Sequence, residues 1–301
     1  VVIYSALAET TKDKVLAGMH LLQQPVPAVV LRAGLGPAPA PPETGARLDI
    51  IRRRGVLTVG YLPDSLPYAF FNAAGDLVGL DIELAHRLAS ELGVRLEFVP
   101  LDRDRAVEQI NAGECDIAMS GVVVTTLRAS RMLFTTSYLD ETMALVTPDR
   151  LRNELATWDQ LRLRPGLKLA IPNVPYFIQK VHERFPQAEL QVIDELKQFF
   201  TAPDGSGADA LVIAAERGSA WTLMYPQFSV VIPEPGVVKL PLAYPIGRHD
   251  QALATFVNTW IELKSKDGTI DALYKYWILG QNAAPRSPRW SIIRNVLHWT
   301  R

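Results

Sequence analysis

Hydrophobic and polar positions in the first half of the chain alternate between two periods. Apolar runs with a two-residue period predict strands, and apolar positions spaced by three and four residues predict helices that bury one face. Strands are expected at residues 57–60, 94–98 and 115–119, and helices at 81–92, with Asp81 as a cap, and at 106–112. This β-α-β-α-β order favours a mostly parallel sheet with helices packed against it.

The same alternation restarts after Pro148 and predicts a second α/β unit. Strands are expected at 167–171, 190–193 and 210–213, helices at 176–185 and 216–224, and two further helical stripes at 253–260 and 270–277. Two α/β units in one chain predict two lobes with a cleft between them.

The two ends of the chain carry different patterns. A short helical pattern at 11–24 precedes a proline-rich stretch at 34–42, which excludes helix and sheet and predicts a semi-rigid linker. The folded body is therefore expected to begin near Arg47, and a docked extension is expected from 281 onward. Because the first residue is Val1, we expect a processed product or a piece of a longer protein. The apolar opening fits equally a remnant of a membrane segment and the first turn of a soluble helix.

The composition is that of a globular protein and narrows the function classes. The 301 residues are 48% hydrophobic and 21% charged, with a formal charge of −1, which argues against a nucleic-acid-binding surface. No apolar run approaches the ~20 residues that span a bilayer. The one cysteine, Cys115, excludes an intrachain disulfide and lies in an apolar run typical of a buried strand.

No set of residues typical of catalysis or metal binding stands out. The five histidines, at positions 20, 86, 182, 249 and 298, show no metal-ligand spacing. The sequence holds no Gly-x-Ser-x-Gly elbow and no phosphate-binding glycine loop. We therefore expect no metal and no cofactor, and a binding protein in preference to an enzyme.

Several short motifs occur in one order. They are Leu57–Tyr61, Leu66–Phe70, Asp76–Ala85, Leu92–Val94, Ala112–Ile117, Ser120–Arg128 and Phe134–Tyr138, followed near the end by Trp260–Trp277. In this order they resemble the bacterial periplasmic solute-binding proteins of family 3, the polar amino-acid type that serves ABC importers. The resemblance covers about residues 47–280 and is weaker in the second lobe.

The resemblance implies a two-lobed α/β fold of the type II periplasmic-binding-protein kind, with mixed, mostly parallel sheets and a hinge. The implied boundaries are an amino-terminal helix and linker at 1–46, lobe 1 at 47–146 plus 245–280, lobe 2 at 147–244, and a carboxy-terminal extension at 281–301. A small anionic ligand is expected between the lobes, and its binding closes the hinge. The implied location is periplasmic or extracytoplasmic, with a transporter permease or a fused membrane domain as partner.

Arg128 is the residue most suited to hold a ligand carboxylate. A guanidinium can grip both carboxylate oxygens, and the arginine of the family's Ser-Gly…Thr-x-x-Arg motif binds the ligand carboxylate. Ser120 and Gly121 would add a hydroxyl and a closely approachable backbone. Thr125 is expected to cap the helix that carries Arg128.

Three further positions in lobe 1 are candidate ligand contacts. Tyr68 and Phe70 resemble the family's aromatic wall, although core packing alone explains such residues as well. Asp64, in the loop before them, either meets a ligand amino group or is simply solvated.

The sequence departs from the family at four candidate positions. Val123 stands where amino-acid binders usually carry a hydroxyl residue. In lobe 2, Asn173 and Tyr176 occupy the turn where the family has a Gly-Ser/Thr-Thr sequence, and Asn173 could cap the helix or donate to ligand. Glu216 lies slightly after the usual amino-group aspartate and either replaces it or is a solvated acid of the helix start. These changes leave both an amino acid and a small organic acid open as ligand.

Two other functions share this fold. The chain could be the sensing or substrate-capturing outer domain of a membrane protein, tethered through its amino terminus. It could also resemble the cyclohexadienyl dehydratases, with Glu216 as the general acid.

Overall fold

The computed structural model describes residue 16 and residues 18–32, 45–202 and 207–281. These residues form two compact units. The first, the discontinuous unit, contains the described residues up to Asp140 and from Pro241 onward, and the second, the inserted unit, contains those from Glu141 to Leu240. The chain therefore crosses between the units twice, a few residues before each of the two predicted boundaries.

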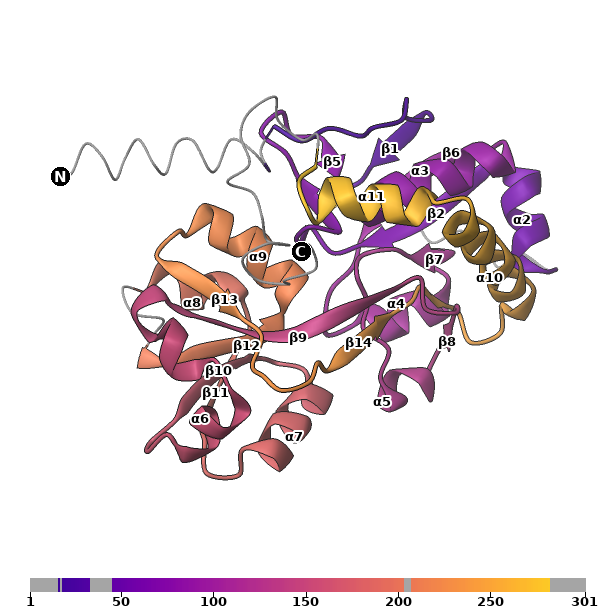
Figure 1. The fold of residues 1–301 in the computed structure, drawn as a ribbon. Helices are drawn as coiled ribbons and strands as arrows, with labels where there is room; N and C mark the ends of the chain where they lie inside the picture. Colours follow the sequence, from indigo (N-terminus) through magenta and orange to yellow (C-terminus); the bar gives the residue numbers. More distant parts are fainter. Residues whose placement is uncertain (1–15, 17, 33–44, 203–206, 282–301) are drawn as a thin grey trace. The chain divides into compact units, whose positions relative to one another are not determined.

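A six-stranded sheet forms the centre of the discontinuous unit (Figure 1). Its order is β1 (Ala28–Val30), β6 (Arg95–Pro100), β2 (Val56–Tyr61), β7 (Ile117–Ala118), β15 (Pro245–Ile246) and β8 (Leu133–Phe134). The first four strands run parallel, whereas β15 is antiparallel to both of its neighbours. A small second sheet contains β3 (Asp64–Ser65), β4 (Ala69–Phe71) and β5 (Leu77–Val78).

The helices of this unit are α2 (Arg47–Arg54), α3 (Leu80–Leu92), α4 (Ala106–Ala112), α5 (Thr126–Ala129), α10 (Gln251–Lys266) and α11 (Thr269–Trp277). Four of them, α3, α4, α10 and α11, follow the predicted stripes, whereas α2 was not predicted. The prediction that Asp81 caps α3 is wrong, because Gly79 is the N-cap residue. Gly79 has φ +135°, and a Cβ there would lie 2.2 Å from the carbonyl oxygen of Tyr68. Only glycine fits this close approach, so Asp81 is left inside the first turn of the helix.

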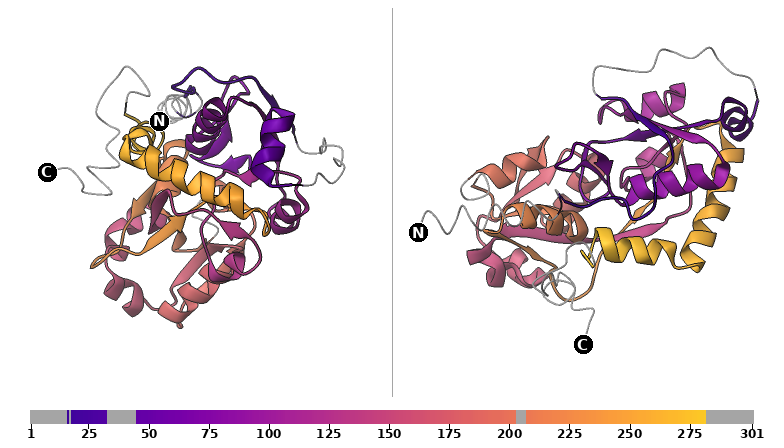
Figure 2. Two further views of the ribbon diagram at one scale, coloured as in Figure 1. Left: turned by 90° about the vertical axis from the view of Figure 1, so that its right-hand side faces the viewer. Right: turned by 90° about the horizontal axis from the view of Figure 1, so that it is seen from above.

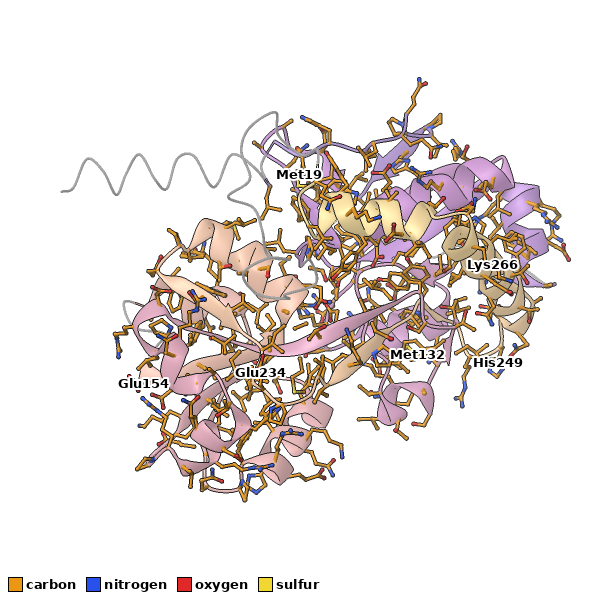
Figure 3. The ribbon with its side chains drawn as sticks, viewed as in Figure 1. Met19, Met132, Glu154, Glu234, His249 and Lys266 are labelled. Carbon is orange, nitrogen blue, oxygen red and sulfur yellow. The ribbon has the colours of Figure 1, made fainter. Side chains whose placement is uncertain are left out.

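A segment before the predicted start of the fold also packs in the discontinuous unit. Its strand β1 pairs with β6 and forms the edge of the sheet, and Met19, labelled in Figure 3, is buried. The backbone N–H groups of Leu22 and Gln23 donate to the buried carboxylate of Glu83, at 2.9 and 3.0 Å. The folded body thus begins well before Arg47, and an acid of α3 fixes the added segment.

The inserted unit has its own sheet, in which the strands run in mixed directions (Figure 2). Its order is β11 (Glu189–Ile193), β10 (Lys168–Pro172), β12 (Ala210–Ala214), β9 (Leu139–Pro148) and β13 (Phe228–Val231), with β14 (Lys239–Leu242) also paired to β9. Strands β10, β11 and β12 are parallel, whereas β9 is antiparallel to β12 and β13. The two crossings of the chain fall within β9 and β14.

Helices cover both faces of the sheet of the inserted unit. They are α6 (Trp158–Leu163), α7 (Pro175–Arg184), α8 (Leu196–Thr201) and α9 (Ala215–Met224), besides a 3₁₀ segment at Asp149–Leu155. Side chains alternate along a strand, so neighbouring residues of β9 serve opposite faces. Val146 lies under Gly218 of α9, where an added Cβ would come within 2.7 Å of it. Leu145 instead joins Trp158 and Val181 in the core beneath α6 and α7.

Some predicted features fall outside the described residues. These are the proline-rich linker at 34–42, residues 11–15 and 17 of the helical pattern at 11–24, and the carboxy-terminal extension from 282. The helix predicted at 11–24 is wrong for its described residues 18–24, which are turns and irregular backbone. Within the described ranges, no helix has the length and apolar character needed to cross a membrane.

Candidate functional site

A buried carboxylate organises the candidate site of the discontinuous unit. Asp81 has no exposed surface and accepts three hydrogen bonds, from Gly121 N at 2.5 Å, Tyr138 Oη at 2.9 Å and Tyr244 Oη at 3.0 Å. The two tyrosine rings stack with their centroids 4.3 Å apart. Burial, followed by the nearby Asp81 charge, raises the pKa of both tyrosines well above the ordinary value, so both remain hydrogen-bond donors.

This carboxylate fixes the loop that follows β7. Gly121 has φ +61°, a conformation that glycine adopts without strain, and its N–H is directed at Asp81. Ser120 is buried, and its hydroxyl exchanges hydrogen bonds with the backbone of Leu62 at 2.9 and 3.2 Å. The Ser120 carbonyl accepts from Ser65 Oγ at 2.7 Å. The hydroxyl predicted to contact ligand therefore braces two loops against each other.

Arg128 lies in the short helix α5 at the end of this loop. Thr125 is its N-cap, as predicted, with Oγ1 accepting from Arg128 N at 3.2 Å. The half-buried guanidinium of Arg128 donates from Nη1 to the carbonyl of Val123 at 2.9 Å. Val123 is itself buried and forms a β-bridge with Leu242. The guanidinium is thus oriented by backbone groups that the sheet holds in place.

The other candidate residues of this unit are engaged within the fold. Tyr68 is fully buried. Phe70 is 5% exposed and packs edge-on against the ring of Trp277, with the two ring centroids 6.0 Å apart. Asp64 is exposed and forms an ion pair with Arg103 at 2.6 Å. The two aromatic rings therefore contribute to the core, whichever further contacts they make.

A second polar cluster lies in the inserted unit, at the start of α9. Glu216 is 1% exposed, and its Oε2 accepts from Thr142 N at 2.9 Å. The side chain of Thr142 accepts from Lys239 Nζ at 3.0 Å, so the hydroxyl joins β9 to β14. Beside them, the equally buried Glu141 pairs with Arg217 Nε at 3.0 Å. We call these five residues the Glu216 cluster.

The Glu216 carboxyl is poised between its two protonation states near neutral pH. Burial raises its pKa to about 7, and the charge of Glu141 adds to the rise. The N–H of Thr142, the N–H of Glu216 itself and the charge of Lys239 oppose it. Such a group can accept an ammonium group when ionised or donate a proton when neutral.

The two remaining candidates lie around the start of α7. Pro175 begins the first helical turn, and the N-cap residue is Val174, which forms no side-chain cap. Of the two roles considered for Asn173, the helix cap is therefore excluded; its Nδ2 donates to Asp194 Oδ1 at 3.1 Å. Tyr176 lies in the first turn of α7.

The sequence alone does not predict the residues that support the loop of Arg128 and the carboxyl of Glu216. Asp81 was interpreted as a cap, and Tyr138, Tyr244, Thr142 and Lys239 carry no local signal, because their partners are far away in the sequence. The predicted ligand residues separate into seven in the discontinuous unit and three in the inserted unit.

Among the described residues, no group of three or more histidine, cysteine or acidic side chains is arranged to hold a metal ion.

Comparison with known proteins identifies the family. Residues 57–280 match the model of the bacterial extracellular solute-binding proteins, family 3. Cyclohexadienyl dehydratase of Pseudomonas aeruginosa is 26% identical over 241 residues, which cover 77% of this chain and 86% of that protein. A probable amino-acid ABC transporter-binding protein of Haemophilus influenzae is 23% identical over 233 residues, covering 77% and 88%.

Solved structures agree with this match. The crystal structure of an ancestral amino acid-binding protein, described as a precursor of cyclohexadienyl dehydratase, has a TM-score of 0.68 and 30% identity. The similarity covers 78% of this chain and all of that one. The family is periplasmic or extracytoplasmic, and the fold is of the type II periplasmic-binding kind, as predicted. This chain belongs to the bacterial extracellular solute-binding proteins of family 3.

Proposed function

We propose that this protein reversibly binds a small carboxylate-bearing metabolite and delivers it for transport, with Arg128 holding the carboxylate. The observation that carries the proposal is the fixed loop from Ser120 to Arg128. The buried Asp81 holds its start through Gly121, and Val123 orients the guanidinium at its end. A donor group that is already ordered loses little conformational entropy on binding, and this favours affinity.

We further propose that the Glu216 cluster meets the other end of the same ligand. An ionised Glu216 would accept the ammonium group of an amino acid, and Asn173 and Tyr176 would add polar contacts. This favours an amino acid over an acid without an amine. Relatives named as amino-acid-binding proteins support that choice. Because the pKa of Glu216 is about 7, ligand binding to its ionised form would release about half a proton per bound ligand at neutral pH.

A second candidate function is a dehydratase. It is supported by the cyclohexadienyl dehydratase relative and by the pKa of Glu216, which keeps about half of that carboxyl protonated near pH 7. A buried neutral carboxyl suits a general acid that protonates a departing hydroxyl group. Incubation with prephenate or arogenate tests it directly. Product formation that Glu216→Gln abolishes would establish the enzyme, and no turnover would favour pure binding.

A thermal-shift screen with amino acids and small organic acids tests the binding function. A ligand that binds only the folded state raises the Tm. At a ligand concentration of 100 times the Kd, it adds about 2.7 kcal/mol to the free energy of unfolding. We expect the largest shifts from amino acids, and smaller ones from the matching acids that lack the amine. A screen in which no carboxylate raises the Tm would contradict the proposal.

The partner of the loaded protein would be a membrane transporter. We propose either a separate ABC permease or a membrane domain of the same protein, reached through the amino terminus. The upstream gene sequence distinguishes these, because a cleavable signal predicts a free binding protein and a membrane domain predicts a tethered one.

A further inference from the structure

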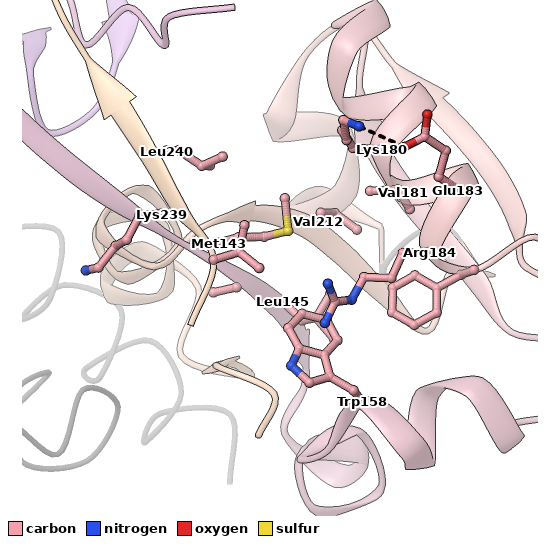
Figure 4. Close-up of a pocket in the computed structure, with 13 residues that line it drawn as sticks. Met143, Leu145, Trp158, Lys180, Val181, Glu183, Arg184, Val212, Lys239 and Leu240 are labelled. Atoms are coloured by element: carbon pink, nitrogen blue, oxygen red, sulfur yellow. Dashed lines mark hydrogen bonds and ion pairs between the residues drawn. The ribbon is translucent and has the colours of Figure 1, made fainter. Parts of the chain in front are cut away.

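The inserted unit also holds a pocket that Lys239 of the Glu216 cluster borders, whereas Glu216 itself does not line it (Figure 4). Its volume is about 330 Å³, at the lower end of the range typical of small-molecule sites. It opens between α7, α6 and the crossing strands, and apolar side chains dominate its walls, among them Met143, Leu145, Trp158, Val181, Val212 and Leu240.

The alternation of side chains along β9 directs Met143 and Leu145 of this pocket away from the face of Thr142, while Ala144 between them also borders the pocket. Thr142 belongs to the Glu216 cluster, whereas Met143, the next residue, lines the pocket. Consecutive strand residues face opposite sides of the sheet. The pocket shares Leu145 and Trp158 with the core under α6 and α7, whereas Glu216 belongs to α9 on the other face.

Within the part of the chain that the structure describes, Arg184 at the rim of the pocket has no carboxylate partner. The guanidinium of Arg184 lies over the ring of Trp158, 4.0 Å from its centroid. Lys180 and Glu183 form an ion pair of 2.8 Å beside it and neutralise each other. Lys239 is directed away from the hollow in Figure 4 and donates to Thr142. Arg184, which lies at the aromatic wall, is therefore the cation best placed to meet an anionic group at the rim.

We propose that this pocket is a second binding site, for a small apolar monocarboxylate such as an aryl or branched aliphatic acid. The apolar part fills the space between Trp158, Met143 and Val212, and the carboxylate meets the Arg184 guanidinium at the rim. Burial of the apolar part supplies most of the affinity, and the charge selects acids over neutral analogues of the same shape.

Methionine methyl groups give a site-specific test on the full chain. The protein has five methionines, and Met143 is the one that lines the pocket. We would label them with ¹³C, assign the Met143 resonance with Met143→Leu, and titrate 3-phenylpropionate. The prediction is a saturable shift of the Met143 methyl group with a Kd on the order of 1 mM or tighter.

Three controls decide the ligand class and the location. The uncharged amide of the probe, and the exposed variant Arg184→Gln, should each weaken binding about fivefold. The exposed Arg152→Gln in the same unit should leave it unchanged. Arg128→Ala should also leave it unchanged, which separates this site from the proposed transport ligand. Equal binding of acid and amide, or no saturable Met143 shift at about 10 mM probe, would overturn the proposal.

Discussion

At the scale of single residues, the Asp81 carboxylate is the main polar support of the candidate site. Replacing it by alanine would leave the N–H of Gly121 and the hydroxyls of Tyr138 and Tyr244 buried without this acceptor. We expect Asp81→Ala to lower the free energy of unfolding by about 3 kcal/mol or more. Urea denaturation measures this. The exposed Asp104→Ala should change it by less than about 0.5 kcal/mol, and equal losses in the two variants would contradict this role.

The second residue-scale prediction concerns the pH dependence of stability. Glu216 has an ordinary pKa of 4.5 and a folded-state pKa of about 7. The folded state holds this proton more tightly than the unfolded state does. The resulting contribution to the free energy of unfolding is therefore complete below about pH 4.5 and is lost as the pH rises through 7. The loss amounts to about 3 kcal/mol at most.

The variant Glu216→Gln keeps an acceptor for Thr142 and cannot ionise. We therefore expect it to gain stability relative to the unmodified protein between pH 5 and pH 8, when both are measured by urea denaturation. Buried Asp116, with a pKa raised to about 6, titrates in both proteins and cancels in the comparison. Parallel curves for the two proteins would contradict the assigned pKa.

Sequence reasoning reached some of these residues. Arg128 and its cap Thr125 were found because both lie within one short motif, where the partners are three residues apart. Glu216 was found by its position after a strand, but nothing local indicates its burial. That burial depends on β9, 74 positions away, which supplies Thr142.

At the scale of elements, the start of α3 depends on one glycine. An alanine at position 79 would need φ +135° and would clash with the carbonyl of Tyr68. Gly93, at the other end of the helix, also has positive φ, but no atom lies within 4 Å of an added Cβ. We expect Gly93→Ala to cost about 1 kcal/mol of unfolding free energy and Gly79→Ala at least twice as much, as measured by urea denaturation. The reverse order would contradict this explanation.

The sequence predicts the helices and parallel strands whose apolar period is regular, but it does not predict the inner strands β9 and β15 or the helices α2, α6 and α8. Strand β1 was missed because its three residues are all exposed and carry no alternating pattern. What fixes that segment is the Glu83 carboxylate, whose partners Leu22 and Gln23 lie about 60 positions away. Contacts of this range leave no periodic signal.

At the scale of the whole molecule, the ordered motifs identified the family and the type II fold, and the family comparison confirms both. The ligand is not predicted as firmly, since the positions that select it are those where this chain departs from the family. Val123, Asn173 and Glu216 occur in loops and at helix starts. Their roles depend on packing that the fold pattern leaves open.

The proposed binding function depends most on Arg128 as the carboxylate anchor. Isothermal titration calorimetry would measure the affinity of Arg128→Ala for the ligand that raises the Tm most in the screen. We predict a loss of about 2–5 kcal/mol of binding free energy with the Tm of the unliganded protein unchanged. The matched variant Arg131→Ala, whose exposed side chain pairs with Glu108, should bind like the unmodified protein. Undiminished binding by Arg128→Ala would contradict the proposed site.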